Sequence, residues 1–500
     1  MASRTALLLL ILFAGVLFTA VPTLANEDNS VPATPFAGTP LCRFGVNVSH
    51  GNQVSIDSFN TGPLRMGWYI DYGASASPSH PNGSEYAPVI RLTQIGSSSY
   101  TYSPSGTALN NAIAANLGAV WMIGNEPDRI DVQDDIEPQV YAKAYHDLYK
   151  LIKAQDPTAR IFAGSIVQPT AVRLTYLDLV LKAYFQQYGQ PMPVDGWSIH
   201  NFILNERSCD AYGNDGNLCW GAEIPPGVDA TDGLIIHNTL EDLQKTISMD
   251  IFRKHVDDFR RWMYDRGYGD KPLYLSEYGV LLPASYGFPP EVVNKFMNDT
   301  FDYLRTARNS TYGYAADDNR LVQRLSWYST SDTSYNGFLY YKPSQNAPYE
   351  LSPMGTNYAN YVAPIAEETE LYPTTLQVSP PAPLTSGGPV TFTISAKIAN
   401  SGNTLAGRQA VVRFYNGDPA KGGVQIGADQ SVTLQGCGAV ATASVTWANI
   451  TPKDYEIFVS VDPANAISEP NEKNNVMSTR VVASTTRVLL PVLRKAYILP

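Results

Sequence analysis

Residues 119–128 read AVWMIGNEPD, an apolar run that ends abruptly in Gly, Asn and Glu. Runs that are apolar throughout, rather than alternating, are typical of parallel strands covered on both faces. Seven more occur along the chain: RFGVNV from Arg43, LRMGWYI from Leu64, APVIRLT from Ala87, RIFAGSIV from Arg160, VDGWSIHN from Val194, PLYLSEYG from Pro272 and LVQRLSWYS from Leu321. The eight runs predict eight parallel strands.

Helical patterns lie between the later runs. Apolar residues recur at helical spacing after Pro138, from Ile251 and after Pro290, and Gly267 stands where a C-terminal cap is expected. Strand followed by helix, repeated over about 320 residues, predicts an α/β fold of the (β/α)8 TIM barrel type. The stretch GASASPSHPNGSEY, between the second and third runs, is too short and broken for a helix, so the outer ring should be incomplete there.

Length and composition narrow the class of protein. Five hundred residues exceed what one hydrophobic core usually organises, so two folded domains are expected. The net charge of −11, with no block of Lys or Arg, argues against a nucleic-acid partner. The six histidines show none of the spacings of a metal site, so neither a catalytic metal nor any other cofactor is predicted.

The first 25 residues contain Arg4 followed by the apolar stretch ALLLLILFAGVLF. This pattern predicts a secretory signal that is cleaved after Ala25. An uncleaved anchor is the alternative, although the stretch is shorter than the roughly 20 residues of a spanning helix. No later stretch is long and apolar enough, so no membrane span is expected after cleavage, and the protein should be secreted or held at the cell surface. Residues 26–41 form a leader.

Four cysteines in an exported protein permit disulfides. Cys209 and Cys219 share one polar loop and can close a small ring, which would leave Cys42 and Cys437 free. Three pairings are open. The loop belongs to a long insertion, about residues 202–246, which is expected at the carboxyl end of a strand, where barrels place their sites.

Composition changes near residue 366. The predicted barrel covers residues 42–365 and a Pro- and Ser/Thr-rich linker covers 366–373. Beyond it, apolar and polar residues alternate, which predicts an immunoglobulin-like antiparallel β-sandwich over residues 374–482. The tail, 483–500, is either an added edge strand or a surface-retention signal.

Glu126 and Glu277 close the fourth and seventh runs. In a barrel the carboxyl ends of these strands face one cleft. Cleavage of a glycosidic bond with retention needs two carboxyl groups about 5 Å apart, one protonated and one ionised. The two glutamates are therefore the predicted catalytic pair.

At these residues the sequence resembles the clan A glycoside hydrolases, retaining enzymes built on (β/α)8 barrels. The resemblance rests on Asn125-Glu126-Pro127 and Glu277-Tyr278-Gly279. It implies Glu126 as acid/base, Glu277 as nucleophile and Asn125 as partner of the sugar 2-hydroxyl, and it implies that Trp327 floors the sugar subsite. Tyr278 is counted with the substrate-binding residues.

Four further residues have two alternative interpretations each. Arg65 either orients the nucleophile, as an Arg does in this clan, or is a surface cation. His200 contacts Glu277 or substrate, or is a satisfied histidine at a strand end. Asn47 and His50 bind hydroxyls or only form turns.

The stretch VDPANAISEPNEKNNV, residues 461–476, resembles the closing hairpin of a CARDB domain, a sandwich found in bacterial adhesion-related proteins. Turn chemistry is the favoured explanation of its Asn and Glu residues, and a calcium site of Asp462, Glu469 and Glu472 is the alternative. The domain is expected to contact polysaccharide or the cell surface.

Together these patterns predict a secreted retaining glycoside hydrolase that cleaves β-glycosidic bonds of a poly- or oligosaccharide by double displacement, without cofactor. The alternative from another class is a catalytically silent carbohydrate-binding or adhesion protein on a barrel scaffold. Transglycosylation by the same residues is a third hypothesis.

Overall fold

The computed structural model describes residues 40–48, 54–130, 132–207, 221–229, 239–332, 335–380, 388–402, 407–451 and 453–481. The predicted signal, leader and tail, His50, and the pairing of Cys209 with Cys219 lie outside these residues. Within them, no helix has the length and apolar character needed to cross a membrane.

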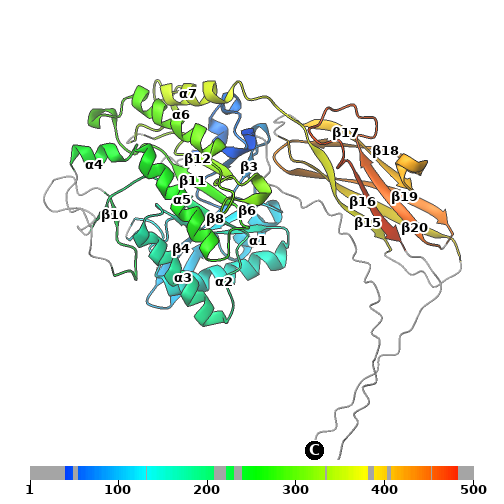
Figure 1. Ribbon diagram of the computed structural model, residues 1–500, viewed down its shortest axis with the longest axis horizontal. Helices are drawn as coiled ribbons and strands as arrows, with labels where there is room; N and C mark the ends of the chain where they lie inside the picture. The colour runs from blue at the N-terminus through cyan, green and yellow to red at the C-terminus, as the bar shows by residue number, and fades with distance from the viewer. Residues whose placement is uncertain are drawn as a thin grey trace, which may run out of the picture.

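Each of the eight predicted runs contains a strand, and all eight belong to one sheet (Figure 1). The strands are β1 (Phe44–Asn47), β2 (Trp68–Ile70), β4 (Val89–Ile95), β6 (Val120–Ile123), β7 (Arg160–Ile166), β8 (Gly196–His200), β11 (Leu273–Tyr278) and β12 (Arg324–Trp327). With β3 (Glu85–Tyr86) and β5 (Ser99–Ser103), the order across the sheet is β3-β2-β1-β12-β11-β8-β7-β6-β4-β5. Only the β4–β5 hairpin is antiparallel.

The two ends of this order come together through neighbouring segments of chain. Strand β3 pairs with β2, and β4, which begins only three residues after Tyr86, pairs with β6. The amide of Val89 also donates to the carbonyl of Gly73, at 2.8 Å. The link is made by a two-residue strand and single backbone bonds, so the domain is described as a large curled, mostly parallel sheet rather than as the closed barrel that the sequence predicts.

Helices cover the outside of the curled sheet (Figure 1). They are α1 (Gly106–Ala115), α2 (Pro138–Gln155), α3 (Ala171–Tyr188), α4 (Leu240–Lys245), α5 (Met249–Asp265), α6 (Pro290–Thr306) and α7 (Pro353–Val362). The predicted helices after Pro138, from Ile251 and after Pro290 are confirmed as α2, α5 and α6. Between β2 and β3 the chain forms only a short 3-10 turn, Pro81–Gly83, as the broken composition there predicts.

Aromatic rings fill the inside of the sheet near its amino end. Trp68, Phe162 and Tyr274 are fully buried in one cluster. Gly196 makes room for the Phe162 ring, since a Cβ at this position would lie 2.2 Å from it. Because this end is solidly packed, only the carboxyl ends of the strands are left to form a site.

The C-terminal domain is the predicted antiparallel sandwich. One sheet has the order β15-β16-β19 and the other β18-β17-β20-β21. The strands are β15 (Leu371–Ser379), β16 (Val390–Asn400), β17 (Arg408–Asn416), β18 (Val424–Leu434), β19 (Ala439–Ile450), β20 (Tyr455–Val461) and β21 (Val476–Val481). β15 begins inside the predicted linker, because the apolar residues at its start are buried in the sandwich core.

The acidic stretch after β20 is a network of turns. Asp462 accepts a hydrogen bond from the amide of Ile467 at 2.7 Å, Glu469 accepts from the amide of Leu371, and Glu472 accepts from the amide of Glu469 at 3.0 Å. These carboxylates are occupied by backbone donors, which supports the turn interpretation over the calcium site.

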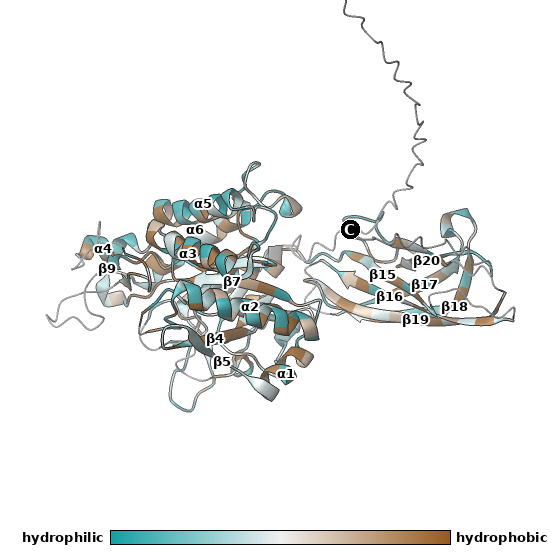
Figure 2. Ribbon diagram, turned by 90° about the horizontal axis from the view of Figure 1, so that it is seen from below, coloured by the Kyte–Doolittle hydropathy of each residue, from teal (hydrophilic) through white to brown (hydrophobic). Residues whose placement is uncertain are grey.

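A disulfide joins the two domains. Cys42, two residues before β1, is bonded to Cys437 in the sandwich, so the expectation that both are free is wrong. A second contact brings Gln435 against Gly83. The sandwich lies beside the first domain in both views (Figures 1 and 2). Cys42 lies at the amino end of β1, so the junction is at the amino end of the sheet.

Candidate active site

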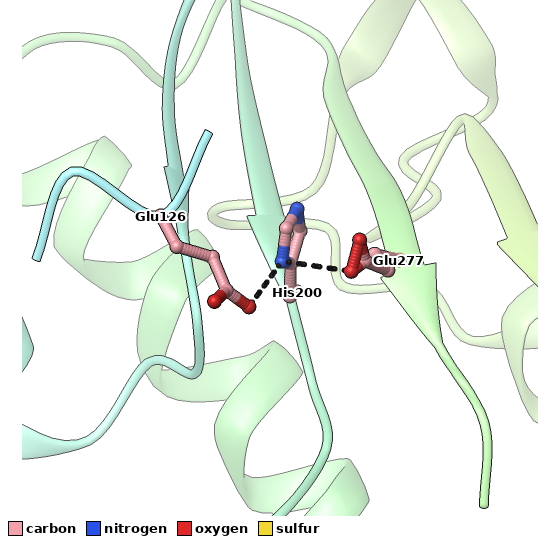
Figure 3. A group of neighbouring side chains, drawn as sticks. All are labelled: Glu126, His200 and Glu277. Carbon is pink, nitrogen blue, oxygen red and sulfur yellow. Dashed lines mark hydrogen bonds and ion pairs between the residues drawn. The ribbon is translucent and has the colours of Figure 1, made fainter. Parts of the chain in front are cut away.

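Three buried side chains meet at the carboxyl ends of the strands. Glu126 follows β6, His200 ends β8, and Glu277 lies near the end of β11 (Figure 3). Nδ1 of His200 lies 2.9 Å from Oε1 of Glu126 and 3.5 Å from Oε2 of Glu277. One oxygen of each carboxylate and one ring nitrogen all lie within 4.8 Å of one another. The curled sheet thus brings together two carboxyl groups that are 151 residues apart in the sequence.

The backbone around this group adopts uncommon conformations. Four residues at or near the carboxyl ends of parallel strands have positive φ although none is Gly: Tyr72 (62°), Glu126 (45°), Ser165 (52°) and Ile203 (55°). Such conformations cost about 1–3 kcal/mol each and cluster at functional sites. At Glu126 the conformation is held by two backbone hydrogen bonds, from its amide to the carbonyl of Ser165 at 2.9 Å and from the amide of Arg129 to its carbonyl at 3.0 Å.

The two carboxyl groups differ in their proton affinity. Burial raises the pKa of Glu277 to about 7; His200 opposes this rise, whereas the negative charge of Glu126 adds to it. Burial would also raise the pKa of Glu126, but the hydrogen bond with His200 and the nearby charge of Arg129 bring it below its ordinary value. In the substrate-free site, Glu126 is therefore the ionised member of the pair, and Glu277 holds a proton up to about neutral pH.

Tyr72 is a site residue that the sequence did not indicate. Its hydroxyl donates a hydrogen bond to Oε1 of Glu277, and its side chain is buried. Tyr72 stands two residues after β2, in the sequence WYIDYG. The sequence shows only that this residue is aromatic. The side chain points toward Glu277 because Tyr72 has a positive φ, which a Tyr rarely adopts, and a sequence does not reveal that conformation.

Asn125 lies beside Glu126, as its position in the sequence requires, and is buried. Its side-chain amide donates to Oε1 of Gln133 at 3.2 Å, and its backbone amide donates to Asp134 at 2.8 Å. The loop that follows β6 therefore fixes the orientation of Asn125 before any sugar is bound.

Two of the predicted aromatic residues do not face the carboxylates. Trp327 is fully buried, and its indole N–H donates to the carbonyl of Gly337 at 2.7 Å. Tyr278 is fully buried too, and packs edge-on against Trp327. A fully buried ring offers no face to a sugar, so the expected roles of Trp327 as subsite floor and of Tyr278 in substrate binding are corrected.

The next residue, Tyr328, has different surroundings from Trp327. Tyr328 is only partly exposed; burial raises the pKa of its hydroxyl, and the charges of Glu277 and Glu126 add to this rise. Its ring lies 5.8 Å from that of Phe202 and 6.4 Å from that of Tyr335. Successive residues of a strand point to opposite sides, so a difference of one position separates a ring in the core from a ring that senses the charges of both glutamates.

Arg65 and Asn47 occupy other places than expected. Arg65 donates to the carbonyls of Val362 and Ile365, at 2.9 and 2.7 Å, so it caps the carboxyl end of α7. This position before β2 is at the amino end of the sheet, and the expectation that Arg65 orients the nucleophile is corrected. Asn47 is fully buried, and its amide donates to the carbonyl of Ser276 at 2.9 Å, so it supports the strand of Glu277 rather than facing a substrate.

The same three residues are the ones that could hold a metal ion. Glu126, His200 and Glu277 offer two oxygens and a nitrogen, a donor set that suits zinc and similar divalent ions. The Nδ1 atom of His200 is already shared between the carboxylates, so a metal would compete with the proton held there. Whether the site uses a metal is decided by measuring the metal content of the purified protein.

The family comparison identifies the C-terminal domain. Residues 375–479 match the CARDB family. The predicted CARDB domain is confirmed. It is also similar to a solved CARDB domain from Pyrococcus furiosus, with 20% identity over 23% of this chain and 90% of that one, at a TM-score of 0.19.

The first domain has similarities among solved structures at low identity. An endo-β-1,3-glucanase of GH128 (subgroup I) from Amycolatopsis mediterranei shares 15% identity over 64% of this chain and 99% of its own, with a TM-score of 0.37. A GH128 (subgroup VII) oligosaccharide-binding protein from Trichoderma gamsii shares 14% over 64% and 93%, with a TM-score of 0.34. No curated protein matches the sequence.

Proposed function

We propose that the protein is a retaining glycoside hydrolase that cleaves β-glycosidic bonds, with Glu277 as nucleophile and Glu126 as acid/base. The observation that carries this proposal is the convergence of the two buried carboxylates, whose nearest oxygens lie within 4.8 Å of each other. Retaining enzymes hold their carboxyl groups about 5 Å apart, whereas inverting enzymes leave about 6.5–9.5 Å for a water molecule. The curled sheet is interpreted accordingly as a (β/α)8 barrel.

In the proposed reaction, Glu277 attacks the anomeric carbon while Glu126 donates a proton to the departing oxygen. A covalent glycosyl ester forms on Glu277 and the glycosidic bond breaks. Water then attacks the same carbon, Glu126 takes its proton, and the ester bond to Glu277 breaks. Two displacements restore the original configuration of the sugar.

The resting distribution of protons is the reverse of what the first step requires. Glu277 must lose its proton before it attacks, and Glu126 must gain one before it donates. His200 contacts both carboxylates through one nitrogen, so it is placed to pass a proton from Glu277 to Glu126 when substrate enters. The tyrosine hydroxyl of Tyr72 then stabilises the ionised form of Glu277.

The first experiment is a screen of the purified protein on aryl β-glycosides and on β-glucan, xylan, mannan and galactan. Glu277→Ala and Glu126→Ala should each lower kcat/KM by at least about a thousandfold. Glu291→Gln, an exposed change in the first turn of α6, is the matched control and should leave kcat/KM unchanged.

Azide assigns the two roles. In Glu277→Ala, azide replaces the nucleophile and should give a glycosyl azide of inverted configuration. In Glu126→Ala, azide replaces water in the second step and should give a product of retained configuration. The opposite pairing would exchange the roles, and hydrolysis that persists in both variants would exclude this mechanism. Binding of a glucan without turnover in the wild type would favour the silent carbohydrate-binding protein.

We further propose that the protein acts outside the cell, with the CARDB domain as an accessory module that contacts polysaccharide or the cell surface. The disulfide between the domains supports this placement, because disulfides persist in oxidising surroundings. The test is to compare binding of the whole protein and of a variant that ends after residue 365 to insoluble polysaccharide. Equal binding would remove the proposed role of the CARDB domain.

A further inference from the structure

A row of alternating charges leads from the insertion after β8 to Glu126. The insertion contains β9 (Glu206–Arg207) and β10 (Ala222–Glu223), which pair with each other. Arg207 contacts one oxygen of Glu223, and the other oxygen accepts a hydrogen bond from Nε of Arg129 at 3.0 Å. Nη1 of Arg129 in turn lies 3.6 Å from Oε2 of Glu126. Arg129 therefore bridges the insertion and the proposed acid/base.

Glu206 and Glu223, at the insertion end of this row, are held in place by Arg173. Arg173 is fully buried, and it donates to Asp128 at 2.6 Å, to Glu206 at 2.9 Å and to the backbone carbonyl of Glu223 at 2.6 Å. Because Glu223 is held through both its backbone and its carboxylate, it sets the place of the Arg129 guanidinium. Only 16% of the Arg129 side chain is exposed, so its charge is partly shielded from solvent.

The two oxygens of Glu126 have different partners. Oε1 faces His200 at 2.9 Å, and Oε2 faces Arg129 at 3.6 Å. His200 connects Glu126 to Glu277, whereas Arg129 connects it to a charge outside the catalytic pair. Residues of the insertion can therefore change the proton affinity of Glu126 through Arg129, independently of Glu277.

We infer that Arg129 is a positioning residue for the acid/base Glu126 and that Glu223 sets how strongly it acts. The inference rests on the proposed function. The positive charge of Arg129 favours the ionised form of Glu126, which is the form that must act as base in the second displacement. The carboxylate of Glu223 offsets part of the Arg129 charge, so that Glu126 can still take up the proton that it donates in the first displacement.

Two substitutions should move the pH profile in opposite directions. The alkaline limb of kcat reports the enzyme-substrate complex, in which the proton has moved to Glu126, so it follows loss of that proton from the acid. Arg129→Gln removes a cation near Glu126, so its pKa rises and the alkaline limb should move up by about one pH unit. Glu223→Gln frees Arg129 to act on Glu126 alone, so the alkaline limb should move down.

Controls separate this effect from a loss of structure. Arg266→Gln removes an arginine that follows α5 directly and forms an ion pair with Asp178 of α3, and it should leave the limb unchanged. Arg129→Lys should give an intermediate profile, because lysine keeps the charge but lacks the fork that spans Glu126 and Glu223. No movement of the limb in Arg129→Gln, or movement in the same direction for both substitutions, would overturn the inference.

A measurement that needs no turnover keeps the inference testable if no glycan is cleaved. The imidazole of His200 can be titrated by NMR after isotope labelling of the histidines. Removal of the Arg129 charge should raise the pKa of His200 in Arg129→Gln, and the Arg266→Gln titration should match the wild type. An inactive protein with this shift would exclude the proposed function alone, whereas an unmoved His200 would exclude the role of Arg129.

Discussion

Replacement of Glu277 by Gln should stabilise the protein at alkaline pH. Glu277 is buried and its pKa is raised from 4.5 to about 7, so folding disfavours its ionised form. Between these two values the unfolded chain has lost the proton and the folded protein has kept it. The free energy of unfolding therefore falls as pH rises from 4.5 to 7, and above 7 the full penalty is present. Each pKa unit corresponds to about 1.4 kcal/mol, so the penalty is about 3 kcal/mol.

Glu277→Gln cannot ionise and should escape that penalty. At pH 8 its free energy of unfolding should exceed that of the wild type by about 1–3 kcal/mol, and at pH 4.5 the two should be similar. The lower value of this range, about 1 kcal/mol, applies if a proton on His200 offsets part of the charge of the ionised Glu277. Glu126→Gln should behave oppositely, because the lowered pKa of Glu126 contributes stability above its ordinary pKa, and this contribution is lost as pH falls.

The assay is urea denaturation at pH 4.5, 6 and 8, followed by tryptophan fluorescence for the first domain. The control is Glu291→Gln, an exposed change that should give the wild-type curve at each pH. A Glu277→Gln variant that is less stable than the wild type at pH 8 would refute the reasoning. It would mean that the carboxylate of Glu277 is stabilised by its partners in the folded state.

Three further changes test other parts of the structure. Tyr72→Phe removes the hydroxyl that donates to Glu277, so kcat should fall about 10- to 100-fold and the acidic limb of the kcat profile, which reports ionisation of Glu277 in the substrate complex, should move up; an unmoved limb would contradict this role. The double change Cys42→Ser and Cys437→Ser opens a bridge across 395 residues and should lower the free energy of unfolding by about 2–4 kcal/mol, as measured by denaturation without reductant; an unchanged curve would show that the bridge is dispensable. Arg65→Met should lower the melting temperature while kcat stays at the wild-type value, and the reverse result would restore Arg65 to the active site.

The positions of the strands could be predicted because their cause is local. The longer buried parallel strands are apolar runs, and all eight predicted runs contain a strand in the structure. The helices were harder. α3 has the sequence AVRLTYLDLVLKAYFQQY, which is apolar on most sides, so it shows little helical periodicity and was not predicted.

The candidate site was predictable as far as it depends on strand order. Glu126 and Glu277 converge because both follow strands of one curled sheet, whereas the direction of each side chain depends on details that a single sequence does not carry. Trp327 and Tyr328 differ by one position and face opposite sides. Arg65 has the right residue type for the clan but lies at the wrong end of its strand.

The attachment of the CARDB domain has a consequence for how the molecule works. The chain enters this domain after α7, and the disulfide returns to Cys42, two residues before β1, so both connections leave from the amino end of the sheet in the first domain. Glu126 and Glu277 lie at the opposite, carboxyl end of that sheet. Under the proposed function, a molecule attached through its sandwich would direct Glu126 and Glu277 away from the point of attachment, so a bound polysaccharide chain and the bond to be cleaved would occupy different ends of the molecule.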